Sequence, residues 1–201
     1  MAMTPLDACN AIQAIRGDAI VVCTMTSMNV LDTIAPNHPL TLSSVPLMGG
    51  AAALGLGIAL AQPDRKVIVL DGDSSLLMEL GVLSTVAGGK PANFYHFVFA
   101  NRVQFNGNFA LDLAGDGKVD FAGVARSSGY VAAEHWETAD DLNKLSAWLD
   151  TKGPRLVELE MNPSVSRLSA SNPPTQTTDE RFARMGLEAA GIRQAFGFAT
   201  P

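Results

Sequence analysis

Mainly apolar runs alternate along this chain with segments of helical periodicity. Four short runs are typical of strands buried on both faces of a sheet; they cover residues 19–23, 66–70, 93–100 and 155–161. Apolar positions recur at helical spacing in residues 5–15, 28–34, 48–61, 76–87, 120–127, 138–149 and 179–192. This alternation predicts a three-layer α/β fold, a mostly parallel sheet with helices on both faces.

Polar stretches separate these elements and divide the chain. Residues 35–44 and 101–118 are expected to be loops, and the second is long and glycine-rich, as functional loops often are. Residues 162–178 are rich in Ser, Pro and Thr and predict a linker. We therefore expect one domain at residues 1–168, followed by a C-terminal linker and short helix at residues 169–201.

Composition narrows the class of protein. The 201 residues allow one ordinary domain with a sizeable core, because 47% of them are hydrophobic and 17% charged. A net charge of −6 and the lack of a basic stripe argue against nucleic-acid binding. An acidic protein that binds a phosphorylated ligand would need a metal ion or oriented backbone amides to offset the repulsion.

Cysteine usage and hydropathy indicate a cytoplasmic protein. Cys9 and Cys23 are too few for a disulfide framework. The longest small and apolar run, residues 45–61, is shorter than a membrane span and rich in glycine, which favours a helix packed closely against a sheet. No secretory signal is visible, and no membrane contact is expected.

Polar residues at the carboxyl ends of the strands are the candidates for chemistry, since ligands of open α/β sheets bind there. Asp73 follows one predicted strand, and Asn101 follows the next strand 28 residues further on. Carboxylate and amide oxygens suit Mg²⁺, which often shares such ligands with substrate phosphates. A helix beginning near Ser75 would add free amides for those phosphates. The alternative for Asp73 is a simple helix N-cap.

Three other sequence features do not indicate a binding site. The segment that begins Asp71-x-Asp73-x-Ser75 lacks the glycine and glutamate of a calcium loop. Gly55-x-Gly57 lies inside a predicted helix, where a dinucleotide-binding loop does not occur. His96 lies inside a predicted strand and is interpreted as a core residue.

The segment from Val69 to Met78, followed by Ala100-Asn101, resembles the Gly-Asp-Gly…Asn-Asn signature of thiamine-diphosphate enzymes. The resemblance extends to Pro46-Leu47-Met48-Gly49 and to Gly55-Leu56-Gly57, and it covers residues 5–168. The chain looks most like the diphosphate-binding domain of phosphonopyruvate decarboxylases and of the beta subunit of sulfopyruvate decarboxylases. The resemblance implies the thiamine-diphosphate-binding fold.

Roles for single residues follow from this resemblance. Asp73 and Asn101 would bind Mg²⁺ through side-chain oxygens, and Val103 through its backbone carbonyl. The residues that would contact thiamine diphosphate are Thr24, Met25, Pro46, Met48, Gly72, Asp73, Ser74, Ser75 and Asn101.

Different residues of that set would contact different parts of the cofactor. Ser74 and Ser75 would donate to the diphosphate, as would the strand end at residues 24–25. Met48 would hold the cofactor in its bent conformation, and the carbonyl of Pro46 would accept from the aminopyrimidine. Without the resemblance, Met48 would be interpreted as a core methionine.

Two positions depart from the signature. Ser74 replaces its second glycine, and the added side chain is expected to weaken cofactor binding without abolishing it. Ala100 replaces the first asparagine, but Asn101 keeps the position of the metal ligand.

A further departure concerns the rest of the enzyme. Family members need a pyrimidine-binding domain whose glutamate activates the cofactor, and no catalytic residue is expected in this chain. The resemblance therefore implies the cofactor-binding subunit of a 2-oxoacid decarboxylase, completed by a pyrimidine-domain partner in a hetero-oligomer or by a homodimer. Residues 47–57 would form part of that contact, and Arg102 and Lys118 are candidate contacts for the anionic substrate.

Two alternatives stay open at this stage. One is a protein that binds thiamine diphosphate without turnover; Ser74 and the presence of a single domain favour this alternative. The other is a transferase subunit of the acetolactate-synthase kind, which would share the cofactor and differ in the second substrate.

Overall fold

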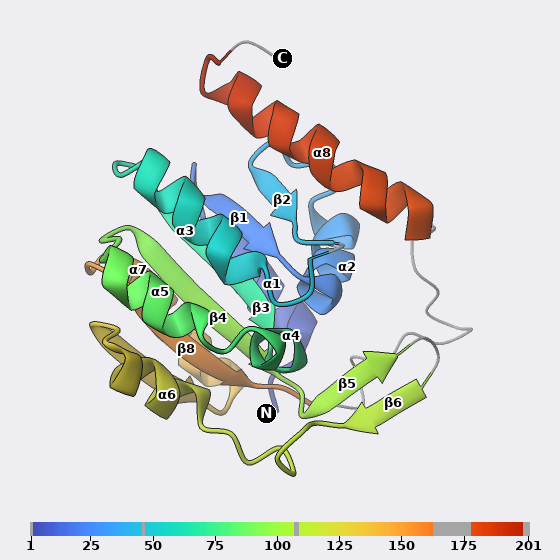
Figure 1. Ribbon diagram of the computed structural model, residues 1–201, viewed down its shortest axis with the longest axis vertical. Coiled ribbons are helices and arrows are strands. Elements are labelled where there is room, and N and C mark those ends of the chain that lie inside the picture. Colours follow the sequence, from blue (N-terminus) through green and yellow to red (C-terminus); the bar gives the residue numbers. More distant parts are fainter. Residues whose placement is uncertain (1, 46, 107–108, 163–177, 199–201) are drawn as a thin grey trace.

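A six-stranded, wholly parallel sheet forms the centre of the fold (Figure 1). The computed structural model describes residues 2–45, 47–106, 109–162 and 178–198. In spatial order the strands are β2 (Thr41–Ser43), β1 (Ile20–Cys23), β3 (Val67–Gly72), β4 (Phe94–Ala100), β8 (Arg155–Glu160) and β7 (Ala132–Trp136). The expected α/β fold is confirmed, and the four strands predicted from apolar runs are β1, β3, β4 and β8.

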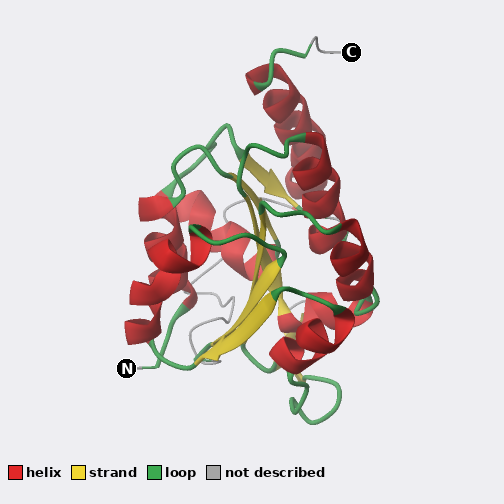
Figure 2. Cartoon of the chain, turned by 90° about the vertical axis from the view of Figure 1, so that its left-hand side faces the viewer, coloured by secondary structure: helices red, strands yellow, loops and turns green. Residues whose placement is uncertain are grey.

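Helices cover both faces of this sheet (Figure 2). On one face the core includes residues from α3 (Ala51–Ala61), α5 (Val82–Gly89) and α6 (Phe121–Ser128). On the other face it includes residues from α1 (Pro5–Ile15), α2 (Met25–Ile34) and α7 (Leu145–Leu149). The strands between them are apolar on both sides because both faces are buried.

Close helix–sheet packing explains the glycine content of α3. A Cβ atom on Gly55 would lie 2.4 Å from Cγ2 of Val69, whereas one on Gly57 would meet nothing within 4 Å. Gly55 therefore lets the backbone of α3 approach β3, and Gly57 faces away from the sheet.

No helix among the described residues is long and apolar enough to cross a membrane.

The last helix, α8 (Thr178–Ala195), returns to the edge of the sheet. The carboxylate of Glu188 accepts hydrogen bonds from the backbone N–H and the hydroxyl of Ser43 on β2. Arg184 forms a bidentate ion pair with Asp32 of α2. Ile192 is buried in the core that α3 also lines. This helix is longer than the short helix expected at residues 179–192, and it covers the otherwise open edge of β2.

Several expected elements were wrong in detail. The expected loop at residues 35–44 contains β2, and the one at 101–118 contains an antiparallel hairpin of β5 (Val103–Asn106) and β6 (Phe109–Asp112). Strand β7 was not expected at all. These strands lie at the edges of the sheet or outside it, where burial on both faces does not impose a continuous apolar run.

Two segments that were each predicted as one helix form two shorter helices in the structure. The helix expected at residues 76–87 is in fact α4 (Asp73–Met78) and α5, because Glu79 leaves the helical region with φ −135° and ψ 42°. The helix expected at residues 138–149 is a 3₁₀ helix, η1 (Ala139–Lys144), followed by the single turn of α7.

Candidate functional site

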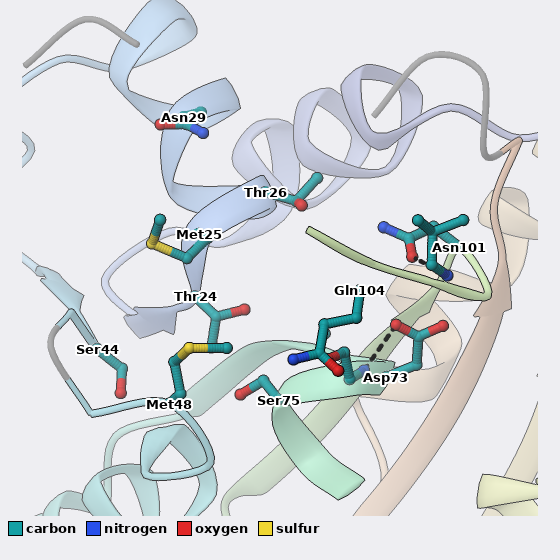
Figure 3. A pocket seen from close by; sticks show the side chains of 13 residues that line it. Thr24, Met25, Thr26, Asn29, Ser44, Met48, Asp73, Ser75, Asn101 and Gln104 are labelled. Atoms are coloured by element: carbon teal, nitrogen blue, oxygen red, sulfur yellow. Dashed lines mark hydrogen bonds between the residues drawn. The ribbon is translucent and has the colours of Figure 1, made fainter. Parts of the chain in front are cut away.

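A cleft opens at the carboxyl ends of β1, β3 and β4. The chain passes from β1 outward to β2 on one side of the sheet, and from β3 to β4 on the other. Crossovers in opposite directions leave a crevice between β1 and β3, the position at which open α/β sheets bind ligands. The residues that line it, drawn in Figure 3, are Thr24, Met25, Thr26, Asn29, Ser44, Met48, Gly72, Asp73, Ser74, Ser75, Asn101, Val103 and Gln104.

The structure brings together the residues predicted from the sequence. Every predicted cofactor or metal residue lines this cleft except Pro46, which lies outside the described residues. Sequence reasoning assigned no role to four further lining residues, Thr26, Asn29, Ser44 and Gln104. Asn29 lies one turn after Met25 on α2, and helical spacing alone could have placed it on the same face.

Asp73 is the first residue of α4, and the N-cap is Gly72. The carboxylate is 1% exposed. Its Oδ2 accepts a 2.7 Å hydrogen bond from the backbone N–H of Arg102, and its Oδ1 accepts one of 2.7 Å from that of Ser74. Burial raises the pKa of Asp73 to about 6, although these two amides act in the opposite direction. Asp73 therefore joins two elements rather than capping its own helix.

Asn101 directly follows β4 and lies on the same side of the cleft as Asp73 (Figure 3). Its side chain is 5% exposed, and Oδ1 accepts a 2.9 Å hydrogen bond from the backbone N–H of Val103. Between the two, Arg102 adopts a left-handed conformation with φ 60°. This turn places Asn101 and Val103 on the cleft lining beside Asp73.

Hydroxyl groups surround the start of α4. The Oγ of Ser74 is buried and has no hydrogen-bond partner among the described residues. The Oγ of Ser75 accepts a 3.0 Å hydrogen bond from the backbone N–H of Gly49. A buried hydroxyl without a partner costs free energy unless a ligand satisfies it. The orphaned Ser74 hydroxyl therefore points to a polar ligand at this place.

Two methionines form the apolar wall of the cleft. Met25 begins α2 and is 39% exposed, and Met48 is 48% exposed. Met48 precedes α3, which begins at Ala51 instead of at the expected residue 48. The core interpretation of Met48 is wrong, because both side chains flank the cleft (Figure 3).

This set of groups fits a magnesium diphosphate. The Asp73 carboxylate and the Asn101 side-chain amide line the cleft together with Val103, and oxygen donors of this kind suit Mg²⁺. Each oxygen of Asp73 has one amide donor and keeps a lone pair for a metal ion. Among the described residues the lining contains no Lys or Arg, so an anion would depend on a cation and on the amides and hydroxyls of α4.

The guanidinium of Arg102, a candidate substrate contact, is held in ion pairs within the chain. It binds Glu158 at 2.7 Å and Glu160 at 2.8 Å and does not line the cleft. Lys118 is highly exposed and pairs with Asp116 at 3.4 Å. The positive charge of Arg102 is therefore compensated inside this chain.

His96 is a core residue, as expected. It is fully buried in β4, and its Nε2 lies 3.5 Å from Oδ2 of Asp71. Its Nδ1 lies 3.4 Å from the hydroxyl of Tyr130. The group lies behind the cleft and does not line it.

Comparison with known proteins agrees with this geometry. Residues 19–159 match the family model of the thiamine pyrophosphate enzyme, C-terminal TPP binding domain; thiamine pyrophosphate is another name for thiamine diphosphate. The chain belongs to this family. A Streptomyces hygroscopicus phosphonopyruvate decarboxylase is 37% identical over 166 residues, which are 77% of this chain and 40% of that protein. The chain thus spans well under half the length of that enzyme.

Two further relatives differ in how much of them the chain covers. Sulfopyruvate decarboxylase subunit beta of Methanothermobacter thermautotrophicus is 31% identical over 189 residues, 92% of this chain and 96% of that subunit. A solved Mycobacterium smegmatis structure, described as a thiamin diphosphate-dependent enzyme, superimposes with a TM-score of 0.67 at 25% identity. It covers 78% of this chain and 31% of the other.

Proposed function

We propose that this chain binds Mg²⁺ and thiamine diphosphate and is the cofactor-binding subunit of a 2-oxoacid decarboxylase. The observation that carries the proposal is that Asp73 and Asn101 line the same cleft as Ser74, whose hydroxyl has no hydrogen-bond partner in the part of the chain that the structure describes. Hard oxygen ligands and free donors for an anion then lie within one cleft. That combination is what a metal-bound diphosphate requires.

The metal ligands would come from adjacent strand ends. Asp73 and Asn101 would supply side-chain oxygens, and Val103 would supply its carbonyl oxygen. The buried carboxylate must be ionised to bind the metal, and a divalent cation would offset the burial that raises its pKa.

The rest of the cleft would hold the organic cofactor. Ser74 and Ser75 would donate to the diphosphate together with the polar groups of Thr24 and Met25. Met48 would support the bent cofactor, and the carbonyl of Pro46 would accept from the aminopyrimidine. Bound thiamine diphosphate would supply the nucleophilic carbon and the electron sink that decarboxylation of a 2-oxoacid needs.

A second subunit would complete the site. The described lining residues include no glutamate, so the activating carboxylate would come from a pyrimidine-domain partner or from a second copy of this chain. Support comes from the Methanothermobacter relative, which is named a beta subunit and matches this chain over nearly its whole length. The exposed side chains of Leu47 and Met48 give the cleft an apolar margin that a partner would cover.

Reconstitution tests this function. The chain, its partner and the mixture would be incubated with Mg²⁺, thiamine diphosphate and either sulfopyruvate or phosphonopyruvate, and released CO₂ would be measured. Turnover by the mixture, lost when the chain carries Asp73→Ala, is expected. Tight cofactor binding without CO₂ release would instead favour a binding protein without turnover. Carbon–carbon bond formation after addition of a second 2-oxoacid would favour the transferase alternative.

A further inference from the structure

The turn between β4 and β5 is held by Arg102, which does not line the cleft but contacts a residue that does. Its left-handed backbone, with φ 60°, is costly for a residue that carries a Cβ atom. In this conformation its N–H donates to Oδ2 of Asp73 at 2.7 Å, and its carbonyl accepts from the N–H of Leu113 at 3.1 Å. The backbone of Arg102 thus joins the proposed metal ligand to the segment after the hairpin.

The side chain of Arg102 anchors this turn to β8 and to the segment before α6. Nη2 donates to Glu158 Oε1 at 2.7 Å and to Glu160 Oε2 at 2.8 Å, both on β8. Nη1 donates to the carbonyl of Val119 at 3.2 Å. Glu158 is 2% exposed, and its other oxygen accepts from the N–H of Ala122 in the first turn of α6. A strained turn is therefore fixed by charge-assisted hydrogen bonds to a buried, rigid partner.

The same contacts account for a nearby acidic cluster. His135, Glu158 and Glu160 lie close enough to hold a cation. The guanidinium of Arg102 already binds both carboxylates, and His135 pairs with Glu160 at 3.4 Å. The cluster is thus the receptor for Arg102 and needs no metal ion.

We infer that Arg102 is a positioning residue of the magnesium site. Its ion pairs with Glu158 and Glu160 hold the left-handed turn in place, so that its own amide orients Asp73 while Asn101 and Val103 face the metal position. Groups outside the ligand set that orient metal ligands commonly contribute 10- to 100-fold to metal affinity. This inference rests on the proposed function for its metal, whereas its structural part concerns the chain without any ligand.

Arg102→Gly isolates the side chain. Glycine retains the backbone N–H that donates to Asp73 and adopts φ 60° without strain, while the guanidinium and the aliphatic part of the side chain, which lies beside Gly117, are lost. Because the variant leaves Glu158 buried and unpaired, the double variant Arg102→Gly/Glu158→Gln removes that orphaned charge while keeping an acceptor for Ala122. Lys90→Gly is the matched control, since it also replaces a basic residue of left-handed backbone, φ 50°, and Lys90 does not line the cleft.

Two measurements separate this inference from the proposed function. In the chain without ligands, hydrogen exchange at the amides of residues 102 and 103 is expected to lose protection in both Arg102 variants. Protection in the core strands of the double variant should stay as in the wild type. With saturating thiamine diphosphate, the Mg²⁺ concentration at half-maximal binding is expected to rise about 10-fold or more in the double variant and to stay unchanged in Lys90→Gly.

Each outcome has one meaning. Unchanged protection at residues 102 and 103 overturns the anchoring role, whatever the cofactor does. Lost protection with an unchanged Mg²⁺ midpoint overturns the link to the metal. If the wild-type chain binds no thiamine diphosphate with its partner present, the proposed function fails and the metal link fails with it, while the exchange result still decides the anchor.

Discussion

The hydroxyl of Ser75 on α4 accepts a 3.0 Å hydrogen bond from the backbone N–H of Gly49, in the loop that carries Met48. Gly49 has φ +83°, and a Cβ atom there would lie 2.6 Å from Cγ of Glu79. This contact ties the start of α4 to the opposite wall of the cleft. The proposed diphosphate donors and the proposed support for the bent cofactor are therefore held in a fixed relation.

Ser75→Ala is expected to weaken thiamine diphosphate binding about 10-fold, since a hydrogen bond to a charged group and the tie to Gly49 are both lost. The unfolding free energy should fall by about 1 kcal/mol, because the Gly49 N–H loses its partner. Calorimetric titration and chemical denaturation measure the two effects. Ser84→Ala, at an exposed position of α5, is the control. Equal affinities in the two variants would remove Ser75 from the site.

Ser74→Ala should separate binding from stability. The Ser74 hydroxyl is buried without a partner among the described residues, so its removal should leave the melting temperature unchanged or raise it. Affinity for thiamine diphosphate should nevertheless fall about 5- to 10-fold, if the diphosphate satisfies this donor. Tighter binding by Ser74→Ala would show that the hydroxyl only obstructs the site.

Met48→Ala tests the apolar wall. Because Met48 is 48% exposed, its truncation should change the unfolding free energy by less than about 0.5 kcal/mol. Loss of its contact with a bound cofactor should weaken binding by about 1 kcal/mol, or roughly fivefold. Met78→Ala is the matched control, because Met78 is 44% exposed and does not line the cleft. A similar loss in both variants would contradict a specific role for Met48.

The raised pKa of Asp73 sets a pH dependence for metal binding. Mg²⁺ binds the ionised carboxylate, so with a folded-state pKa of about 6 its affinity should be constant above about pH 7. Below pH 6 it should fall by up to about 10-fold per unit. Titration with Mg²⁺ at saturating thiamine diphosphate from pH 5 to 8 measures this. A midpoint near pH 4 would show that Asp73 is not desolvated.

The raised pKa of Asp73 also makes the free energy of unfolding depend on pH, and this dependence runs opposite to that of metal binding. The folded state holds the Asp73 proton more tightly than the unfolded state, so this group contributes stability below about pH 4. That contribution is lost as pH rises through about 6, and bound Mg²⁺ should offset the loss. Denaturation with and without Mg²⁺ and cofactor across this range should therefore diverge as pH increases.

Gly55→Ala and Gly57→Ala form a matched pair on α3. The first should destabilise the fold by about 1–3 kcal/mol, since its Cβ would overlap Val69 on β3. The second should be neutral or stabilising by up to about 1 kcal/mol, because its Cβ meets nothing and alanine favours helix. Thermal and denaturant unfolding of the two variants provide the comparison. Equal stabilities would contradict the close approach of α3 to the sheet.

The sequence predicted the central strands because burial on both faces leaves a plain signal. Strands β1 and β4 are buried throughout and β3 is buried up to Asp71, and the apolar runs lie within one or two residues of the observed bounds. Strand β2 is three residues long, and β7 has a mixed burial pattern.

The site was predicted for a related reason. Its residues follow directly after strands whose positions were clear, and topology then brings those strand ends together. The ion pairs of Arg102 were not predicted because its partners on β8 are more than fifty residues away in the chain. A local sequence pattern does not indicate whether a single arginine faces a ligand or a buried carboxylate.

The most direct test of the account is calorimetric titration of the purified chain with thiamine diphosphate, with Mg²⁺ or with EDTA, alone and with its partner subunit. Saturable binding in Mg²⁺ is predicted, with none in EDTA and none in Asp73→Ala. Binding that persists in EDTA or in Asp73→Ala would contradict the metal site. Absence of binding with the partner present would contradict the central claim that this cleft holds the cofactor.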